Sequence, residues 1–240
     1  MSVTKNIYNK YANYRFKDIN LSGSIGVTPR ILQIANIVGS GKRILDIGCG
    51  TGEFSEYLKK TGNEIIGIEI TDICTEICKK KGLQVITLDI EKYTLPDLGQ
   101  FDFILMLEVI EHLIDPLPVL RDKIRKLLKK DGSLIISTIN CVAFKFRLSL
   151  LLGNLPDFGE NKKSLEEYRP YNLHHKSLFT INSLLKVLKL AGFNIVTRFE
   201  STANTPSKLW DLKIFRSIRY LLQKVYPPLF ITDFLVVTKR

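Results

Sequence analysis

Short apolar runs alternate along this chain with longer segments in which apolar residues recur every three or four positions. An apolar run bounded by turn residues is typical of a strand buried on both faces, whereas the helical spacing is typical of a helix packed on one side. The pattern predicts seven strands, at residues 43–47, 64–70, 83–88, 101–107, 133–139, 193–199 and 231–238.

Helix signals stand between these strands, and they predict helices over residues 54–58, 72–82, 115–127 and 180–191. Asp115 is expected to cap the third of these helices, with Pro116 in its first turn. Asp131 and Gly132 are expected to turn the chain into the fifth strand. The alternation predicts an α/β, doubly wound, Rossmann-like fold with a seven-stranded, mostly parallel sheet whose last strand is antiparallel.

A single domain of this kind accounts for all 240 residues. Right-handed crossovers place its ligand crevice at the carboxyl ends of the parallel strands. Within residues 1–240 we expect N-terminal cap helices at 1–40, a cofactor-binding half at 41–140, a substrate-side insertion at 141–178, and C-terminal strands at 179–240 with a basic amphipathic helix at 207–224.

Composition limits the class of protein. Hydrophobic residues make up 45% and charged residues 25%, which is typical of a soluble globular protein. Residues 1–6 show no signal-peptide pattern, and no uncharged apolar run is long enough to span a bilayer. We therefore expect a cytoplasmic protein, with association at a membrane surface left open. The four cysteines show neither a disulfide framework nor zinc spacing.

The net charge of +11 raises the question of an anionic partner. Much of the excess lies in short lysine runs at predicted helix ends, where cations complement the helix dipole. In the segment 207–224, Lys213, Arg216 and Arg219 face away from an apolar side that carries Trp210. Such a helix packs on the domain, contacts an anionic membrane or contacts RNA. Nucleic acid is not expected as a partner, because the charge is not gathered into one stripe.

The sharpest motif follows the first predicted strand. Asp46 precedes three glycines, Gly48, Gly50 and Gly52, in a strand-turn-helix unit with G-x-G-x-G spacing. Glycines let a ligand approach the backbone closely. The spacing differs from the G-x-G-x-x-G of dinucleotide sites, and a carboxylate here would repel a pyrophosphate but can accept hydrogen bonds from an ammonium group. The motif therefore argues against NAD.

This arrangement resembles the class I S-adenosylmethionine-dependent methyltransferase family, over about residues 41–199. The resemblance implies S-adenosylmethionine as the cofactor, with the glycine turn against its methionine part. Glu69, at the end of the second strand, would then accept from the ribose hydroxyls, and Asp89, after the third strand, from the adenine amino group. The full set of implied cofactor contacts is Asp46, Gly48, Cys49, Gly50, Gly52, Glu69, Ile70, Asp89, Ile90 and Leu107.

A second group, Glu108, Glu111 and His112, follows the fourth strand at the mouth of the crevice. One interpretation makes Glu111 and His112 catalytic, with a side chain that accepts or positions the acceptor's proton. Another adds His174 or His175 and makes the group the ligands of a divalent cation, as in quinone-biosynthesis O-methyltransferases and in enzymes that modify the terminal ribose of small RNAs. A purely structural role is the third, and all three stay open.

Two further regions bear on the acceptor. Tyr8 and other aromatic residues near the N-terminus either cover the cofactor or pack in an ordinary way. Residues 147–153 resemble a segment of methyltransferase-like proteins associated with methionine biosynthesis and with surface-glycan gene sets. We therefore expect O-methylation of a small-molecule, lipid or glycan-precursor acceptor. The alternatives are a non-catalytic cofactor-binding helper of a partner enzyme and a metal-dependent RNA ribose methyltransferase.

Overall fold

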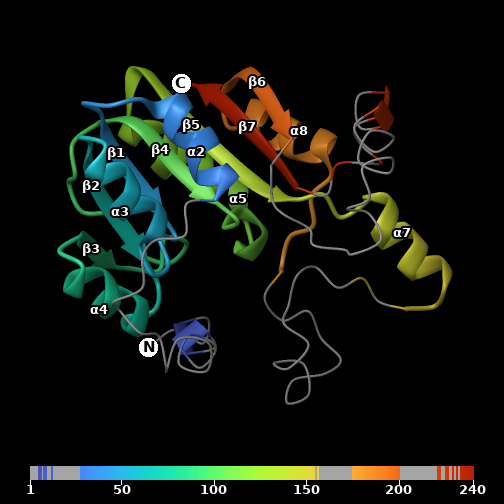
Figure 1. The fold of residues 1–240 in the computed structure, drawn as a ribbon, viewed down its shortest axis with the longest axis horizontal. Coiled ribbons are helices and arrows are strands. Elements are labelled where there is room, and N and C mark those ends of the chain that lie inside the picture. Colours follow the sequence, from blue (N-terminus) through green and yellow to red (C-terminus); the bar gives the residue numbers. More distant parts are fainter. Residues whose placement is uncertain are drawn as a thin grey trace.

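The computed structural model describes residues 28–154, 156, 175–200, 231 and 233–240, with residues 5, 6, 8, 9, 12, 221, 222, 225, 226 and 229 as isolated positions. Its strands form one seven-stranded sheet in the order β3-β2-β1-β4-β5-β7-β6 (Figure 1). They are β1 (Arg43–Ile47), β2 (Glu64–Glu69), β3 (Gln84–Thr87), β4 (Phe101–Leu107), β5 (Leu128–Ile139), β6 (Asn194–Glu200) and β7 (Asp233–Lys239). Neighbours from β3 to β5 pair in parallel, and β7 runs antiparallel to both β5 and β6. The predicted fold, with its antiparallel last strand, is confirmed.

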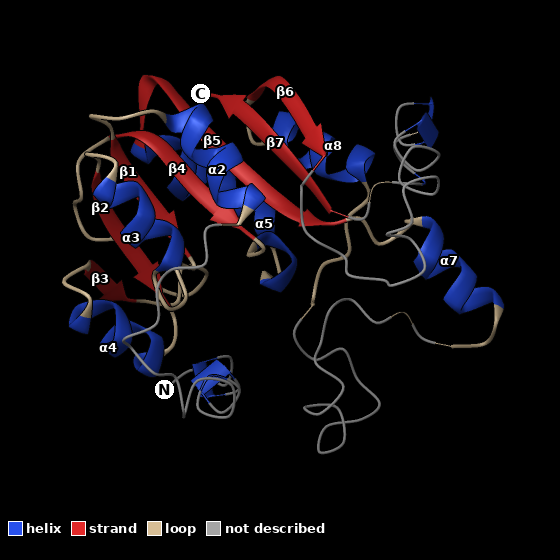
Figure 2. Ribbon diagram, viewed as in Figure 1, coloured by secondary structure: helices blue, strands red, loops and turns tan. Residues whose placement is uncertain are grey.

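Helices cover both faces of this sheet, and α2 and α3 lie across its front in Figure 2. The longer helices are α2 (Pro29–Val38), α3 (Glu53–Lys60), α4 (Asp72–Lys80), α7 (Phe144–Leu151) and α8 (Ile181–Leu190). A further helical stretch joins α5 (Pro116–Pro118), η2 (Val119–Ile124) and α6 (Arg125–Leu127). Ile44 of β1 packs in the cluster with α2 and α3, and the next residue, Leu45, in the cluster with η2 and α8. Successive side chains of a strand point to opposite faces, so each strand serves two cores.

β5 begins at Leu128, five residues earlier than predicted, so the predicted turn at Asp131 and Gly132 lies within the limits of this strand. The pairing of β5 with β4 is instead irregular between Phe101 and Phe103. A Cβ atom at Gly132 would lie 2.9 Å from the carbonyl oxygen of Phe101, which explains the glycine. Phe101 pairs with Leu128 and Phe103 with Ser133, so four residues of β5 stand opposite one of β4, and the turn signal marks this interruption of the pairing.

The helical stretch after β4 begins without the predicted cap. Asp115 occupies the N-cap position, but its side chain makes no capping hydrogen bond. Glu91, in the connection after β3, instead holds the chain just before this helix, because its Oε1 accepts from the backbone N–H of Ile114 at 2.7 Å and of Asp115 at 3.0 Å. A contact so distant along the chain leaves no local signal. Thr180, by contrast, begins α8 through a reciprocal pair of hydrogen bonds with Ser183.

Three other expectations concern the cysteines, the basic helix and membrane-spanning segments. All four cysteines are free thiols, and Cys74 and Cys78 are buried. Most of the predicted basic helix, residues 207–220, 223 and 224, lies outside the described residues and stays a prediction. No helix in the described part of the chain is long and apolar enough to cross a bilayer.

Candidate active site

A cavity of about 260 Å³ opens at the carboxyl ends of β1 to β4. This volume is close to the lower end of the roughly 300–1,000 Å³ that ligand pockets occupy. Four of the implied cofactor contacts lie outside its lining, namely Asp46, Cys49, Gly52 and Leu107. The other six line it: Gly48, Gly50, Glu69, Ile70, Asp89 and Ile90.

The glycine turn after β1 keeps this cavity open. Gly48, Gly50 and Gly52 have φ angles of 69°, 54° and 79°, which residues with a side chain rarely adopt. A Cβ atom at Gly48 would approach Val109 to 2.4 Å, so the turn is tightly packed there. A Cβ atom at Gly50 would meet nothing within 4 Å, and Gly50 lines the cavity. The turn therefore fits a ligand that lies directly against the backbone.

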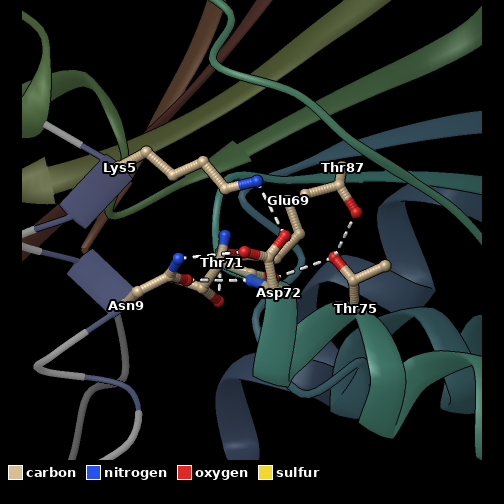
Figure 3. A network of polar contacts seen from close by, with 7 residues as sticks. All are labelled: Lys5, Asn9, Glu69, Thr71, Asp72, Thr75 and Thr87. Atoms are coloured by element: carbon tan, nitrogen blue, oxygen red, sulfur yellow. Dashed lines mark hydrogen bonds and ion pairs between the residues drawn. The ribbon is translucent and has the colours of Figure 1, made fainter. Parts of the chain in front are cut away.

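Glu69 ties the glycine turn to the start of α4. Its Oε2 accepts from the backbone N–H of Gly50 at 2.9 Å, and its Oε1 accepts from the backbone N–H and the hydroxyl of Thr71, each at 2.9 Å. Figure 3 shows Glu69 beside Thr71 at this end of the helix. Because a carboxylate has about four acceptor sites, these bonds leave room for a ligand hydroxyl. Glu69 therefore has a structural role whatever it binds.

Asp46 is buried behind Ile47 and Gly48, which line the cavity. Its Oδ2 accepts from the Ser55 hydroxyl at 2.6 Å. Burial raises the pKa of Asp46 to about 6, with a smaller contribution from the charge of Glu69 and against the opposing effect of the Ser55 hydrogen bond. A ligand cation in the cavity would favour the ionised form of this carboxyl group.

The loop after β3 is held in place by Lys123. The Lys123 ammonium group donates to the carbonyl oxygens of Ile90 at 2.5 Å, Glu91 at 3.0 Å and Tyr93 at 2.9 Å. Within the loop, Oδ1 of Asp89 accepts from the backbone N–H of Glu91 at 3.2 Å. The chain's own contacts therefore hold Asp89 and Ile90 at the cavity wall.

Glu108, the first residue after β4, has a φ of 55°, the only positive φ of a non-glycine residue in the described part of the chain. Its Oε1 accepts from Arg30 of α2 at 2.6 Å and from the Ser137 hydroxyl of β5 at 2.9 Å. The Arg30 guanidinium also donates to Ser137. A backbone conformation of this kind costs roughly 1–3 kcal/mol and is found mainly at functional sites. The Glu108 carboxylate is thus held by α2 and β5 at the cavity wall.

Glu111 lies in a short 3-10 helix, η1 (Ile110–His112), and its side chain is buried. Its Oε2 accepts from the Thr138 hydroxyl at 2.8 Å, while its Oε1 has no hydrogen-bond partner among the described residues. Burial, and after it the charge of Glu108, raises the pKa of Glu111 well above its usual range. The carboxyl group therefore stays neutral under conditions in which an exposed glutamate is ionised.

His112 lines the cavity, and its ring centre lies 4.9 Å from that of His175, with an interplanar angle of 61°. The backbone after His175 holds this second ring in place. The N–H groups of Lys176 and Ser177 donate to the carbonyl oxygen of Glu111 at 2.8 and 3.0 Å. The segment before α8 is thereby fastened to η1.

The structure brings together three of the predicted metal ligands. One ligand atom from each of Glu111, His112 and His175 lies within 4.8 Å of the others. Glu108 does not belong to this group, because Arg30 and Ser137 bind its carboxylate. His174, the alternative histidine, lies outside the described residues.

The chain matches the methyltransferase-domain family over residues 20–198, well over half of its length. It belongs to the class I S-adenosylmethionine-dependent methyltransferases. A ubiquinone biosynthesis O-methyltransferase of Cereibacter sphaeroides is 32% identical over 178 residues, which cover 72% of this chain and 68% of that protein. A protein of the same name from Actinobacillus pleuropneumoniae is 36% identical over 141 residues, 53% of this chain and 58% of that protein. The crystal structure of an S-adenosylmethionine-dependent methyltransferase from Archaeoglobus fulgidus has the same fold, with a TM-score of 0.59 at 23% identity, and covers 97% of this chain and 100% of that one.

S-adenosylmethionine is therefore the methyl donor of this methyltransferase, as the glycine motif implies. Tyr8 and Ala12 of the N-terminal segment line the cavity together with the motif residues. The Tyr8 ring meets His112 edge to face at 5.7 Å, and the Lys176 ammonium group lies 5.9 Å from the Tyr8 ring centre. Burial raises the pKa of Tyr8, and nearby carboxylates, Glu111 first among them, raise it further. The N-terminal aromatic residues were expected either to cover the cofactor or to pack in an ordinary way, and these contacts of Tyr8 favour the first interpretation.

Several groups that shape the methyltransferase site carry no motif signal. Arg30 lies 78 positions before Glu108, and Thr138 lies 27 positions after Glu111. Lys123 stands on the solvent side of an amphipathic stripe, where a lysine is ordinary. Their roles depend on contacts between distant segments, which sequence spacing does not contain.

Proposed function

We propose that this methyltransferase transfers a methyl group from S-adenosylmethionine to a hydroxyl oxygen of a small-molecule acceptor. The observation that carries the proposal is the group of Glu111, His112 and His175 beside the cofactor cavity. A hydroxyl oxygen that accepts a methyl group must lose its proton, so a titratable group is needed at this position. The names of the ubiquinone-biosynthesis relatives support oxygen as the acceptor atom.

The cofactor half binds and orients the donor. The bound cofactor supplies a methyl group on a sulfonium, so the protein's task is alignment and electrostatics. In our assignment the backbone at Gly48 and Gly50 receives the methionine part, Glu69 accepts from the ribose hydroxyls, and Asp89 accepts from the adenine amino group. Asp46 stabilises the ammonium group through its charge from behind the glycine turn. The support for these roles is the cavity lining and the open space at Gly50.

On the acceptor side we assign different roles to His112 and Glu111. His112 lines the cavity, so we assign its imidazole to accept the acceptor's proton. Glu111 lies outside the lining, so its carboxyl group does not face an acceptor in the cavity. Its carbonyl oxygen instead holds the segment that carries His175. Glu111 therefore acts as a positioning residue in this proposal.

A divalent cation held by Glu111, His112 and His175 is a second candidate for this side. The buried, unpartnered Oε1 of Glu111 favours it, because a cation would stabilise the ionised carboxylate. The two candidates differ in their response to a chelator. The proton-accepting histidine predicts that methyl transfer persists in EDTA. Loss of activity in EDTA, with recovery on adding magnesium or manganese, would replace it with the cation.

The acceptor class is tested by incubating the full-length protein with labelled S-adenosylmethionine and cytosolic, membrane or RNA fractions. Label in a low-molecular-weight hydroxyl compound supports the proposal. Label in the lipid or glycan precursors of the membrane fraction extends it to the acceptor that the resemblance of residues 147–153 suggests. Label in RNA alone overturns it. Cofactor binding without label in any fraction favours the non-catalytic helper.

We also propose that α7 contacts an anionic membrane surface. Leu148 and Leu151 on α7 are exposed, the latter to 83%, and Lys145 and Arg147 stand on either side of this apolar stripe. Apolar residues flanked by cations are typical of interfacial helices. Vesicles of phosphatidylglycerol and phosphatidylcholine should therefore bind the protein, less so as salt rises. Lys145→Gln combined with Arg147→Gln should weaken binding to the vesicles. The matched control, Lys186→Gln combined with Lys189→Gln on α8, should leave it unchanged.

A further inference from the structure

The N-terminal segment is bound to the first residue of α4 by a group of three contacts. Lys5 Nζ donates to Oδ1 of Asp72 at 2.7 Å. Asn9 Nδ2 donates to Oδ2 of Asp72 at 3.0 Å, and Asn9 Oδ1 accepts from the backbone N–H of Asp72 at 3.0 Å. Figure 3 shows both side chains reaching Asp72 from the same side. Asp72 is thus satisfied by residues 63 and 67 positions away, rather than by its own helix.

The same segment also forms part of the cavity wall. Residues 5, 6, 8, 9 and 12 are helical, and Lys5 and Asn9 are four positions apart, as are Tyr8 and Ala12. Residues four apart share a helix face. One pair contacts Asp72, while the other lines the cavity, where Ala12 is only 2% exposed. Binding to Asp72 therefore determines where Tyr8 stands.

The contacts at Asp72 lie close to the cofactor-binding groups. Asp72 directly follows Thr71, whose backbone N–H and hydroxyl both donate to Glu69. The segment that receives Lys5 and Asn9 is therefore the one that presents the Glu69 carboxylate to the cavity. On its other side, the Tyr8 ring meets His112 at 5.7 Å. The N-terminal segment thus spans from the cofactor side of the cavity to the acceptor side.

We propose that Asp72 is a positioning residue that latches the N-terminal segment over the cofactor cavity, so that Tyr8 stands in the cavity wall beside His112. Asp72 touches neither cofactor nor acceptor in this role and acts through Lys5 and Asn9. The latch must open for the spent cofactor to leave, because the cavity it covers holds the cofactor. The inference depends on the cofactor cavity alone and not on the identity of the acceptor.

The test measures how fast tritiated S-adenosylhomocysteine leaves the full-length protein in a chase with unlabelled compound. Lys5→Met combined with Asn9→Leu removes the latch and leaves α4 unchanged. We expect dissociation to accelerate by about tenfold, which corresponds to about 1.4 kcal/mol, with a raised KM for S-adenosylmethionine and an unchanged Tm. Asp122→Asn, which breaks an exposed ion pair with Arg121 on η2, is the matched control and should leave the rate unchanged.

A charge exchange separates the latch from a general packing effect. Lys5→Asp and Asp72→Lys should each accelerate dissociation, and the double exchange should restore slow release. An unchanged rate in the Lys5→Met, Asn9→Leu protein would overturn the proposal. Acceleration that the double exchange does not reverse would overturn it as well, because the effect would then come from loosened packing. Neither result would affect the proposed methyl transfer, which is measured separately with saturating cofactor.

Discussion

The proposed cofactor side and the proposed acceptor side of the cavity are built in different ways. The cofactor side consists of the ends of β1, β2 and β3 and the turns that directly follow them. The acceptor side combines η1 with Arg30 from α2, Thr138 from β5 and His175 from the segment before α8. The first is a local construction on consecutive strands. The second depends on how distant segments pack, which explains how one cofactor motif can serve enzymes with different acceptors.

The two sides also differ in how completely their polar groups are satisfied. On the cofactor side Glu69 accepts three hydrogen bonds from the protein. On the acceptor side Glu111 keeps a buried oxygen without a partner among the described residues, and Glu108 has a positive φ. A protein tolerates an unsatisfied buried group or backbone strain chiefly where function requires it. We therefore expect substitutions on the acceptor side to alter the rate of methyl transfer.

The largest expected effect comes from filling the cofactor side. Gly50→Leu should abolish S-adenosylmethionine binding, because the new side chain would extend into the cavity. The φ of 54° adds a strain of about 1–2 kcal/mol. Gly82→Leu is the matched control, since Gly82 has a φ of 71° and open space around its Cβ position but does not line the cavity. Calorimetry that shows equal loss in both proteins would mean that strain, and not occupied space, is responsible.

The next effect sharpens the contrast between the two sides. His112→Ala should lower kcat by about 10²–10⁴-fold, the usual contribution of a general base, while S-adenosylmethionine binding changes little. Steady-state kinetics together with calorimetry measures both quantities. The matched variant His175→Ala should reduce kcat much less, because His175 does not line the cavity. Equal losses in both variants would favour the shared cation over a single proton acceptor.

A pH effect on stability is expected from Asp46. Its pKa is about 6 in the folded protein and near 3.8 when exposed, so the folded protein holds the proton more tightly between these values. The tighter proton binding adds to the free energy of unfolding. This contribution is fully present below pH 4 and is lost as the pH rises to 6, by about 3 kcal/mol in total. Asp46→Asn should remove this part of the slope in urea unfolding measured from pH 4 to 7. An unchanged slope would place the effect on other buried groups.

The smallest effect concerns single cofactor contacts. Asp46→Ala and Glu69→Ala should each weaken S-adenosylmethionine binding by about 1–3 kcal/mol, because the first removes the charge behind the glycine turn and the second removes acceptors for the ribose hydroxyls. Glu69→Ala should also lower the free energy of unfolding, since it leaves the backbone N–H groups of Gly50 and Thr71 without their acceptor. Unchanged affinity in both proteins would falsify these two roles. The NAD affinity of the unmodified protein is measured alongside, and none is expected.

Much of the fold was predictable because its signals are local. β1 and β4 have the predicted limits, since short apolar runs flanked by turn residues describe buried parallel strands. The glycine turn was predictable as well, because its positive φ angles require glycine in the sequence itself. Local signals placed the start of the fifth strand five residues too late, because the turn residues Asp131 and Gly132 lie within an interruption of its pairing with β4.

The amino-acid sequence by itself therefore determined the sheet, the glycine turn and the cofactor that fits them. Only the tertiary structure decided that Glu91 binds the backbone at Ile114, that Arg30 binds Glu108, and that His175 stands beside His112. The physical reason is the range of the interactions. Dihedral preferences and hydrophobic periodicity act over a few residues and leave a pattern in the sequence. A hydrogen bond or ring contact between distant segments depends on the packing of the whole domain and leaves none.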